Sequence, residues 1–342
     1  MAVSIVVGGQ YGSEGKGKVA YYWANKMNAA AVVRVGGSNS GHTVYGAGGS
    51  RHALRMLPTA SIFNQITSVL PAGAYIDIPV LMKEIEETSI AMEKLKIDPN
   101  AMVISEEHRD RELVLNLQKE IGSTLSGTGA AVMERISRSK NVLLARDIPE
   151  LFPFLTDTKE YLRSLLDKGE HVVIEGTQGY GLSNYHAKDY PYATSRDTTA
   201  AGFLAETGLS PFDVEHVVMV IRALPIRVAG NSGPLELEID WKKVSQESGA
   251  EEYFDEKTTV THRVRRVARF TPGIVKEAIL VNRPDVIVLN HMDYIDMPNK
   301  GKNYLSKKQE DFLEEVEKMI GRKISYCGNG EMSILTMEEI HR

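Results

Sequence analysis

Residues 3–18 read VSIVVGGQYGSEGKGK, and this stretch decides the fold class. The β-branched run Val3–Val7 predicts a buried strand, and the glycines after it predict a tight loop that opens a helix through Tyr21 and Trp23. In such a loop, successive backbone N–H groups can curve around an anion, and a lysine adds a compact positive charge. We therefore predict a phosphate site at the end of the first strand.

This glycine loop differs from a Walker motif. Five residues separate Gly9 from Gly15 where that motif has four, and Gly17 stands where a Ser or Thr would bind Mg²⁺. A structural alternative is a tight turn with solvated lysines, but two lysines interleaved with three glycines would serve packing poorly. A P-loop GTPase switch would need the missing hydroxyl after Lys16 and an intact NKxD motif.

Strand-like runs recur along the chain and alternate with helical patterns. The further strand candidates are 31–35, 68–70, 102–104, 172–174, 216–221 and 286–289. The expected helices are Ile78–Leu95, Asp157–Lys168 and Lys307–Ile320. This alternation predicts an α/β fold with a mainly parallel central sheet and helices on both faces. Since no linker rich in Pro, Gly or Ser divides the chain, we expect one domain over residues 1–342 with inserted lobes.

Composition narrows the classes of function. The 342 residues carry a net charge of −5, so no general basic field favours nonspecific nucleic-acid binding. Cys327 is the only cysteine, which excludes an intrachain disulfide and fits a reducing, cytoplasmic setting. The N-terminus lacks a basic leader and reads as a strand rather than a signal peptide. No apolar run approaches the roughly 20 residues of a membrane helix.

A second glycine loop strengthens the phosphate prediction. Residues 36–43 read GGSNSGHT and follow the strand candidate 31–35. The imidazole of His42 can meet a phosphate oxygen there, although a lone histidine is more often structural or exposed. GSEGKGK followed by GGSNSGHT resembles the adenylosuccinate synthetase family, whose hallmarks are GDEGKGK and GGxNAGHT. The resemblance extends to about Asp293 and, more weakly, to Gly330, and implies the P-loop-related fold of that family.

The family implied by these loops couples two steps. A nucleoside triphosphate phosphorylates a purine 6-oxygen, and the amine of L-aspartate then displaces that phosphate. The resemblance places catalysis on Ser13, Lys16, His42 and Gln178, with Mg²⁺ on Ser13 and the Gly41 carbonyl. The residues it assigns to the triphosphate are Gly12, Glu14, Gly15, Lys16, Gly17, His42, Thr43, Asn290, Asp293 and Gly328.

Three further segments resemble the family's purine monophosphate site. Residues 121–124, IGST, are similar to IGTT; residues 175–179, EGTQG, to EGAQG; and residues 190–195, YPYATS, to YPYVTS. The residues implied to bind the monophosphate are Ser13, Asn39, Thr124, Arg138, Gln178 and Thr194. Arg138 falls where the family uses an arginine of the neighbouring subunit, which implies a homodimer. Without the resemblance these residues would be ordinary polar loop residues.

Residues 258–266, TTVTHRVRR, resemble the family's aspartate-binding loop ATTGRRRR. Guanidinium forks suit a dicarboxylate, and the resemblance assigns L-aspartate to Val260, Thr261, Arg263 and Arg265. Val260 and Val264 replace a Thr and an Arg, and His262 replaces a Gly. A solvated basic strand edge is the structural alternative.

The largest departure from the family is Ser13, which replaces the aspartate of GDEGKGK. In the family that carboxylate accepts the purine N1 proton, whereas a serine hydroxyl is a poor base. A serine is also smaller and can accept a hydrogen bond from a 2-amino group, which guanine has and hypoxanthine lacks. The chain therefore resembles the phage-encoded branch of the family, the N6-succino-2-amino-2′-deoxyadenylate synthases. These join dGMP to aspartate on the route to diaminopurine DNA, in the host cytoplasm.

A second departure concerns the triphosphate. Residues 290–293 read NHMD where the family has TKLD, so His291 replaces the lysine that stacks on guanine. This change favours ATP or dATP over GTP. Two alternatives stay open: an ordinary adenylosuccinate synthetase that uses IMP and GTP, and a catalytically inactive nucleotide-binding module.

Overall fold

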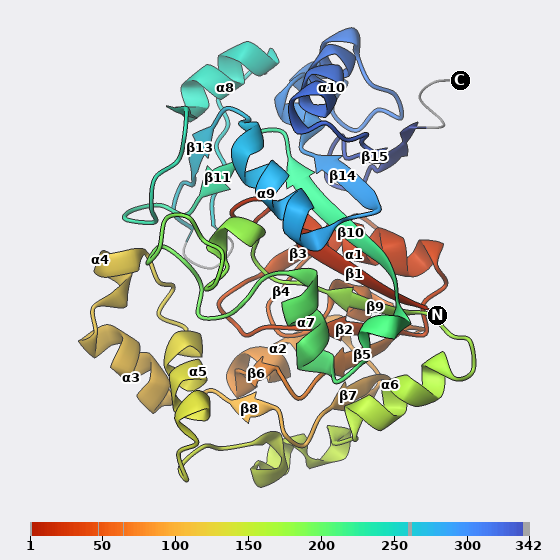
Figure 1. Ribbon diagram of the computed structural model, residues 1–342, viewed down its shortest axis with the longest axis vertical. Coiled ribbons are helices and arrows are strands. Elements are labelled where there is room, and N and C mark those ends of the chain that lie inside the picture. Colours follow the sequence, from red (N-terminus) through yellow and green to blue (C-terminus); the bar gives the residue numbers. More distant parts are fainter. Residues whose placement is uncertain (1, 47, 64, 259–261, 338–342) are drawn as a thin grey trace.

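The computed structural model describes residues 2–46, 48–63, 65–258 and 262–337, which are arranged around a nine-stranded sheet (Figure 1). Neighbouring strands run parallel except at one edge, where the last strand is antiparallel. The order is β16 (Leu335–Thr336), β15 (Tyr326–Cys327), β14 (Val286–Asn290), β10 (Val214–Arg222), β1 (Val3–Gly8), β9 (Val172–Glu175), β2 (Ala31–Arg34), β5 (Thr67–Leu70) and β7 (Leu95–Ile97).

Strand β1 lies near the middle of this sheet. Ile5 pairs in register with Val217 of β10 on one side and with Ile174 of β9 on the other. All six residues of β1 are buried, as a continuous β-branched run requires when both faces of a parallel sheet are covered. The sheet therefore presents the glycine loop at the carboxyl end of a central strand.

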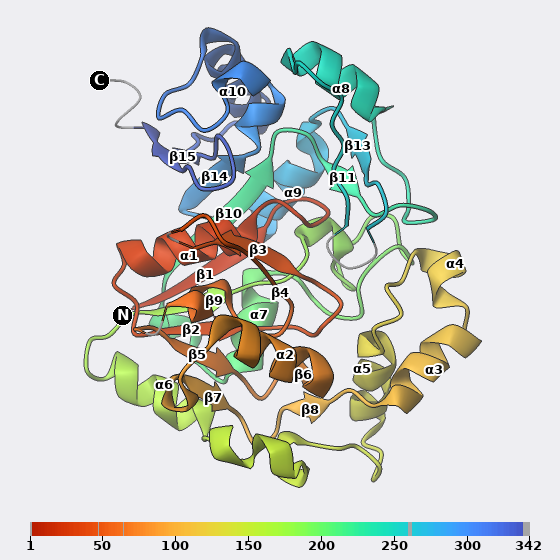
Figure 2. The same ribbon diagram turned by 180° about the vertical axis from the view of Figure 1, so that it is seen from behind.

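Helices cover both faces of the sheet, as the sequence predicts. On one face, Ile5 and Val7 share an apolar cluster with side chains of α6 (Thr158–Leu166), α7 (Ala200–Thr207), α9 (Pro272–Asn282) and α10 (Lys307–Ile320), and α7 and α9 stand in front in Figure 1. On the other face, Val6 packs with Val19 and Trp23 of α1 (Lys16–Lys26), which Figure 2 brings to the front.

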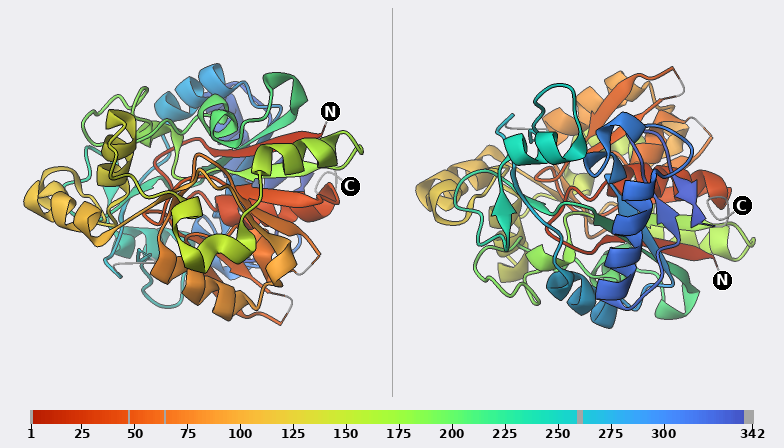
Figure 3. Two further views of the ribbon diagram at one scale, coloured as in Figure 1. Left: turned by 90° about the horizontal axis from the view of Figure 1, so that it is seen from below. Right: turned by 90° about the horizontal axis from the view of Figure 1, so that it is seen from above.

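Smaller elements flank the sheet. Two-stranded sheets join β3 (His42–Tyr45) to β4 (Arg51–Leu54) and β6 (Tyr75–Ile76) to β8 (Met102–Val103); a three-stranded sheet joins β11 (Ile226–Arg227), β13 (Arg266–Ala268) and β12 (Glu238–Ile239). The remaining α-helices are α2 (Ile78–Thr88), α3 (Glu106–Val114), α4 (Leu117–Ile121), α5 (Thr128–Ser137) and α8 (Trp241–Ser248). Helices α3–α5 lie at the end of the molecule opposite the two termini (Figure 3).

The sequence predictions for individual elements were mostly confirmed, with two exceptions. The helix expected over Ile78–Leu95 ends at Thr88, because Ser89 adopts a left-handed φ of 50°, and Leu95 then begins β7. The strand expected at 102–104 forms only as the two-residue β8 beside β6, outside the central sheet. The described residues contain no helix that is long and apolar enough to span a membrane. Organisation as one domain stays a prediction.

Candidate active site

The predicted loops meet at the carboxyl edge of the sheet. The glycine loop follows β1, the loop with His42 follows β2, and Gln178 follows β9; Arg222 and Asn290 end β10 and β14. Chain order reverses around β1, whose neighbours are β9 and β10. The crevice at such a switch point is where open parallel sheets bind their ligands.

A buried carboxylate shapes the glycine loop from inside. Glu14 accepts hydrogen bonds from the backbone N–H groups of Gln10 (3.1 Å) and Gly12 (2.8 Å), and its other oxygen accepts from Lys16 Nζ at 2.6 Å. Ser13 takes a left-handed φ of 55° in this turn. The Glu14 carboxylate is therefore committed to its own loop and does not line either cavity described below.

His42 is held by a network that sequence reasoning missed. Its Nδ1 donates to Glu175 at 2.5 Å, and Glu175 also accepts from the backbone N–H and the hydroxyl of Thr59, each at 2.8 Å. A Cβ on Gly17 would lie 2.7 Å from the His42 Cβ, so only glycine lets α1 approach the histidine this closely. The packing explains why Gly17 stands where a Walker motif has Ser or Thr. Glu175 is the first residue of the EGTQG segment, but nothing in that segment points to His42 as its partner.

Burial and charge keep His42 neutral. Burial is the largest cause that lowers the pKa of His42, to about 4, and the charge of Arg34 is the next. Lys16 also lowers this pKa, while Glu175 raises it by less than the other three together lower it. Arg34 Nη1 lies 3.0 Å from the histidine Nδ1. With Nδ1–H given to Glu175, the neutral ring has Nε2 as its acceptor.

This histidine should make the fold acid-sensitive. The unfolded chain protonates His42 near its ordinary pKa of 6.5, whereas the folded protein holds its pKa at about 4. Between these values the unfolded state binds more protons, so the stability contribution present above pH 6.5 is lost as the pH falls. We expect the melting temperature of wild type to decline more steeply from pH 7 to pH 4.5 than that of His42→Asn, measured by circular dichroism. Equal slopes would contradict the assignment.

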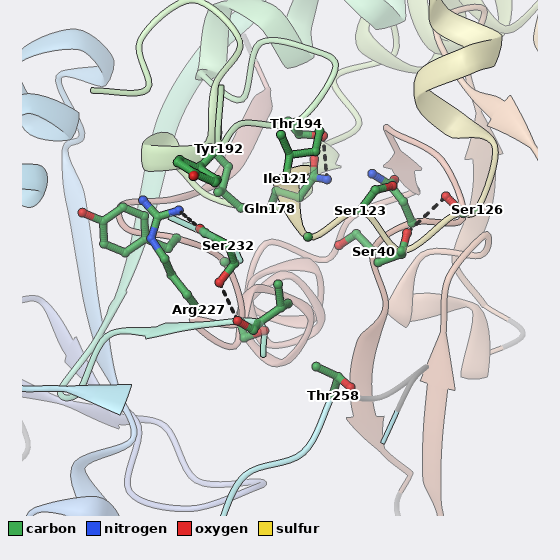
Figure 4. A pocket seen from close by; sticks show the side chains of 18 of the residues that line it. Ser40, Ile121, Ser123, Ser126, Gln178, Tyr192, Thr194, Arg227, Ser232 and Thr258 are labelled. Atoms are coloured by element: carbon green, nitrogen blue, oxygen red, sulfur yellow. Dashed lines mark hydrogen bonds between the residues drawn. The ribbon is translucent and has the colours of Figure 1, made fainter. Parts of the chain in front are cut away.

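A cavity of about 290 Å³ opens beside the glycine loop and contains most of the residues implied for the purine monophosphate. Gln178 Nε2 donates to Thr194 Oγ1 at 2.8 Å, while Gln178 Oε1 is buried without a partner among the described residues (Figure 4). The predicted residues that line the cavity are Gly12, Ser13, Lys16, Asn39, Gly41, His42, Thr124, Gln178, Thr194, Arg263 and Arg265.

Two walls of this cavity differ in chemistry. Ser123 and Ser126 lie across the cavity from Arg227 in Figure 4, and Thr124 belongs to the same hydroxyl wall. The buried carboxylate of Glu112 accepts from three backbone N–H groups at the start of α5, at 2.8–3.3 Å. Glu112 already occupies these donors and also accepts from Ser123 Oγ at 3.4 Å, so Thr124 and Ser126 carry the hydroxyls left to meet an anion on that side.

A second cavity of about 290 Å³ lies on the other side of the same loops. Its predicted residues are Gly15, Lys16, Gly17, His42 and Thr43, all implied for the triphosphate, together with Ser13, Gly41 and Arg265. Five residues predicted for the triphosphate do not line it: Gly12, which lines only the first cavity, Glu14, Asn290, Asp293 and Gly328. Asn290 Nδ2 instead donates to the Glu14 carbonyl at 2.8 Å and so supports the loop from behind. The two cavities share five residues: Ser13, Lys16, Gly41, His42 and Arg265.

The arginine loop reaches this junction through Arg265. Arg265 donates from Nη1 to Ser13 Oγ, and Arg263 lines only the first cavity. Val260 and Thr261, also implied for aspartate, lie outside the described residues. Glu256, which sequence reasoning missed, pairs with Arg265 and also with the fully buried Arg222.

The remaining predicted residue, Arg138, lies away from both cavities of its own chain. It is exposed, and it ends α5 with a left-handed φ of 58°. This placement leaves its side chain available to a neighbouring subunit.

The predicted magnesium ligands lie at the cavity junction, but they are neutral oxygens. The described residues contain no cluster of three acidic, histidine or cysteine side chains suited to a metal. Mg²⁺ in phosphoryl-transfer sites typically keeps waters and takes oxygens from the substrate phosphates. Ser13 and the Gly41 carbonyl fit such an ion only as minor ligands, and bound phosphates would have to supply the negative charge.

Two cavities that meet at a lysine, a histidine and an arginine are the arrangement expected of an enzyme that joins two polar substrates. Comparison with known proteins identifies the family. The adenylosuccinate synthetase family model matches residues 5–148 and 142–302. Adenylosuccinate synthetase of Methanocaldococcus jannaschii is 37% identical over 338 residues, covering 96% of this chain and 94% of the relative; that of Methanococcus vannielii is 38% identical over 339 residues, covering 96% of each. The chain belongs to the adenylosuccinate synthetase family and is a carbon–nitrogen ligase of that type.

Two solved structures are similar over nearly the whole chain. Succinoaminodeoxyadenylate synthetase (PurZ) of cyanophage S-2L, bound to dGMP and dATP as an energy donor, has a TM-score of 0.81 and 30% identity and covers 98% of this chain and 95% of that one. Fully ligated adenylosuccinate synthetase of Plasmodium falciparum has a TM-score of 0.84 at 18% identity, covering 98% and 99%, which supports the fold alone.

Proposed function

We propose that this ligase joins L-aspartate to C6 of dGMP with hydrolysis of ATP, and forms N6-succino-2-amino-2′-deoxyadenylate. The observation that carries the proposal is Ser13. It lines both cavities, at the position of the family's aspartate, and its hydroxyl leaves room for a 2-amino group that a carboxylate would exclude. The likeness to a phage enzyme solved with dGMP and dATP supports the same choice.

The reaction would proceed through a 6-phosphoryl purine. The purine 6-oxygen attacks the terminal phosphorus, the N1 proton passes to solvent water, and the nucleoside diphosphate departs. The neutral aspartate α-amine then attacks C6, one amine proton passes to water, and inorganic phosphate leaves. Such transfers depend mainly on positioning and charge neutralisation. Lys16 would neutralise the transferring oxygens. A protonated His42 would donate from Nε2 to the bridging oxygen, and the negative charge of the bound triphosphate would favour this form over the neutral ring. Magnesium, held by phosphates with Ser13 and Gly41, would add positive charge there.

The other substrate contacts follow from the cavity walls. Gln178, whose Oε1 is buried without a partner among the described residues, would read the purine 6-position. Thr124, Thr194 and Asn39 would hold the 5′-phosphate. Arg263 and Arg265, with Val260 and Thr261, would bind the carboxylates of aspartate, because guanidinium forks match them.

The placement of the 290–293 segment supports ATP over GTP. Asp293, the acidic residue that would read guanine, is 5% exposed and does not line the second cavity, whereas His291 and Tyr294 do. Burial, opposed by the charges of Lys18 and Lys300, raises the pKa of Asp293. An aromatic pair, His291 and Tyr294 with ring centroids 5.1 Å apart, offers stacking surface without a guanine-specific carboxylate.

A homodimer completes the proposal. Large apolar side chains are exposed on α3 and α5, among them Val114 at 85% and Ile136 at 73%, and Arg138 follows directly at the end of α5. Exposed apolar patches of this kind commonly mark protein interfaces. A second copy seated there would bring its Arg138 toward the monophosphate cavity.

Subunit mixing tests the shared site. We expect Arg138→Ala to raise the KM for the nucleotide without lowering the melting temperature. When it is mixed with an inactive Lys16→Ala variant, about a quarter of the sites should become intact, since half of the dimers are hybrids and each hybrid has one complete site. Activity recovered on mixing would be measured against each variant alone. An active monomer on sizing, or no recovery after confirmed exchange, would refute the role of Arg138.

The substrate itself is tested by product mass. Purified enzyme with aspartate, Mg²⁺ and ATP should convert dGMP and not IMP. Conversion of IMP with GTP, and not of dGMP, would favour the ordinary adenylosuccinate synthetase reaction. Triphosphate hydrolysis without any coupled product would favour an inactive nucleotide-binding module.

A further inference from the structure

A carboxylate and two arginines form a partly buried cluster at the cavity junction, in which the Glu256 side chain is 18% exposed and that of Arg265 11%. Glu256 accepts from Arg222 Nη2 at 2.6 Å and Nη1 at 3.3 Å, and its other close cation is Arg265, with Nε 3.4 Å from Oε1. The hydroxyl of Tyr294 also donates to Glu256, at 3.2 Å. Arg222 anchors the cluster, because its side chain is fully buried and its Nη1 donates to the Ser13 carbonyl at 2.9 Å.

Electrostatics keep this carboxylate ionised. Burial would raise the pKa of Glu256, but the charges of Arg222 and then Arg265 outweigh it and bring the pKa to about 2. Glu256 is therefore a permanent anion at neutral pH and a poor proton acceptor. Its chemistry is suited to holding cations in place rather than to removing a proton.

We propose that Glu256 is a positioning residue for the ligase reaction, which fixes the guanidinium of Arg265 at the junction of the two cavities. The carboxylate stands between two cations that would otherwise repel each other, so without it Arg265 loses the anion that keeps it beside Arg222. The remaining hold on Arg265 would be the Ser13 hydroxyl and the Lys257 carbonyl, at 3.3 Å from Nε. The proposal rests on the ligase activity of the family and not on which purine is the substrate.

The neighbouring arginine offers a matched control. Arg266 pairs with Glu238 on β12, with Nε 2.8 Å and Nη2 2.5 Å from the two carboxylate oxygens. This pair has the same chemistry one residue along the chain, yet neither partner lines either cavity. Comparing variants of the two pairs therefore distinguishes an effect on the reaction from an effect on the stability of the loop.

The test compares Glu256→Gln with Glu238→Gln in the full-length enzyme. A misplacement of about 1 Å in a catalytic group can cost about 10²-fold in rate, so we expect Glu256→Gln to lower kcat by at least about tenfold and to raise the KM for aspartate. The KM for the purine monophosphate should change less than about twofold, because Arg265 is proposed to bind aspartate, whereas the monophosphate keeps its own proposed contacts with Thr124, Gln178 and Thr194. Glu238→Gln should leave all three parameters near wild type.

Two further measurements keep the proposal falsifiable. If Glu256 acts through Arg265, the loss from Glu256→Gln should shrink in an Arg265→Lys background, since coupled residues are not additive. Full kcat and aspartate KM in Glu256→Gln would overturn the proposal. So would equal losses in both glutamine variants that track a lower melting temperature. Assays use whichever of dGMP or IMP the wild type converts, so a wrong purine assignment appears in wild type and leaves this comparison intact.

Discussion

Lys16→Ala should lower kcat by at least about 10²–10³-fold, because electrostatic groups aimed at a transferring phosphoryl group are typically worth several kcal/mol. Lys16 is 2% exposed, lines both cavities, and lies 2.6 Å from Glu14. Its charge therefore lies at the junction of the two cavities. Single-turnover release of inorganic phosphate, with aspartate and the purine monophosphate present, would measure the loss.

Loss of Lys16 also leaves Glu14 as a buried anion, which can destabilise the loop. Lys16→Gln separates the two effects, since its amide can still donate to Glu14 while the positive charge is gone. We expect Lys16→Gln to melt closer to wild type than Lys16→Ala does and to be nearly as inactive. More than about a tenth of wild-type activity in a folded variant would exclude the role proposed for this lysine.

Ser13→Asp should shift substrate preference from dGMP toward IMP by about 10²-fold in the ratio of kcat/KM values. The carboxylate adds volume beside the proposed position of the 2-amino group and supplies a base for N1. It would also compete with Glu256 for Arg265, which now donates to the Ser13 hydroxyl. Competition assays with equal dGMP and IMP, read by product mass, give the ratio directly.

Ser13→Ala is the control for this substitution. It keeps the space beside N1 and removes the acceptor, so dGMP should still be preferred while its KM rises several-fold. Unchanged dGMP kinetics in Ser13→Asp would contradict the steric argument. The ligase assignment would stand in that case, because it rests on the family and not on this residue.

Local patterns predicted most of the fold. The β-branched runs at 3–7, 172–174 and 286–289 form strands of the central sheet. A parallel sheet covered on both faces requires apolar side chains on both sides of a strand, so its strands are continuous apolar runs. The helix Lys307–Ile320 appears with the expected bounds, since Ser306 caps it and Gly321 ends it. The sequence did not predict that the helix beginning at Ile78 ends at Thr88. Its apolar spacing continues past this residue, and the left-handed turn at Ser89 ends the helix.

Motifs predicted the residues that line the cavities, but not those that hold them. Glu175 and Arg34 orient His42 from the ends of β9 and β2, and their role depends on strands that are far apart in the sequence but adjacent in the sheet. Glu256 and Arg222 meet only because β10 brings the arginine beneath the second cavity. Such partners have no fixed spacing, so a single sequence does not reveal them.

The contact of Gly17 with His42 has an evolutionary consequence. Any side chain at position 17 would push against the imidazole, with a Cβ 2.7 Å from that of His42. A descendant of this protein could not acquire the hydroxyl with which Walker-type nucleotidases grip their metal and also keep the histidine in place. A hydroxyl at position 17 and a histidine packed against that position therefore exclude each other at this turn. Replacing the one arrangement by the other requires more than a single substitution.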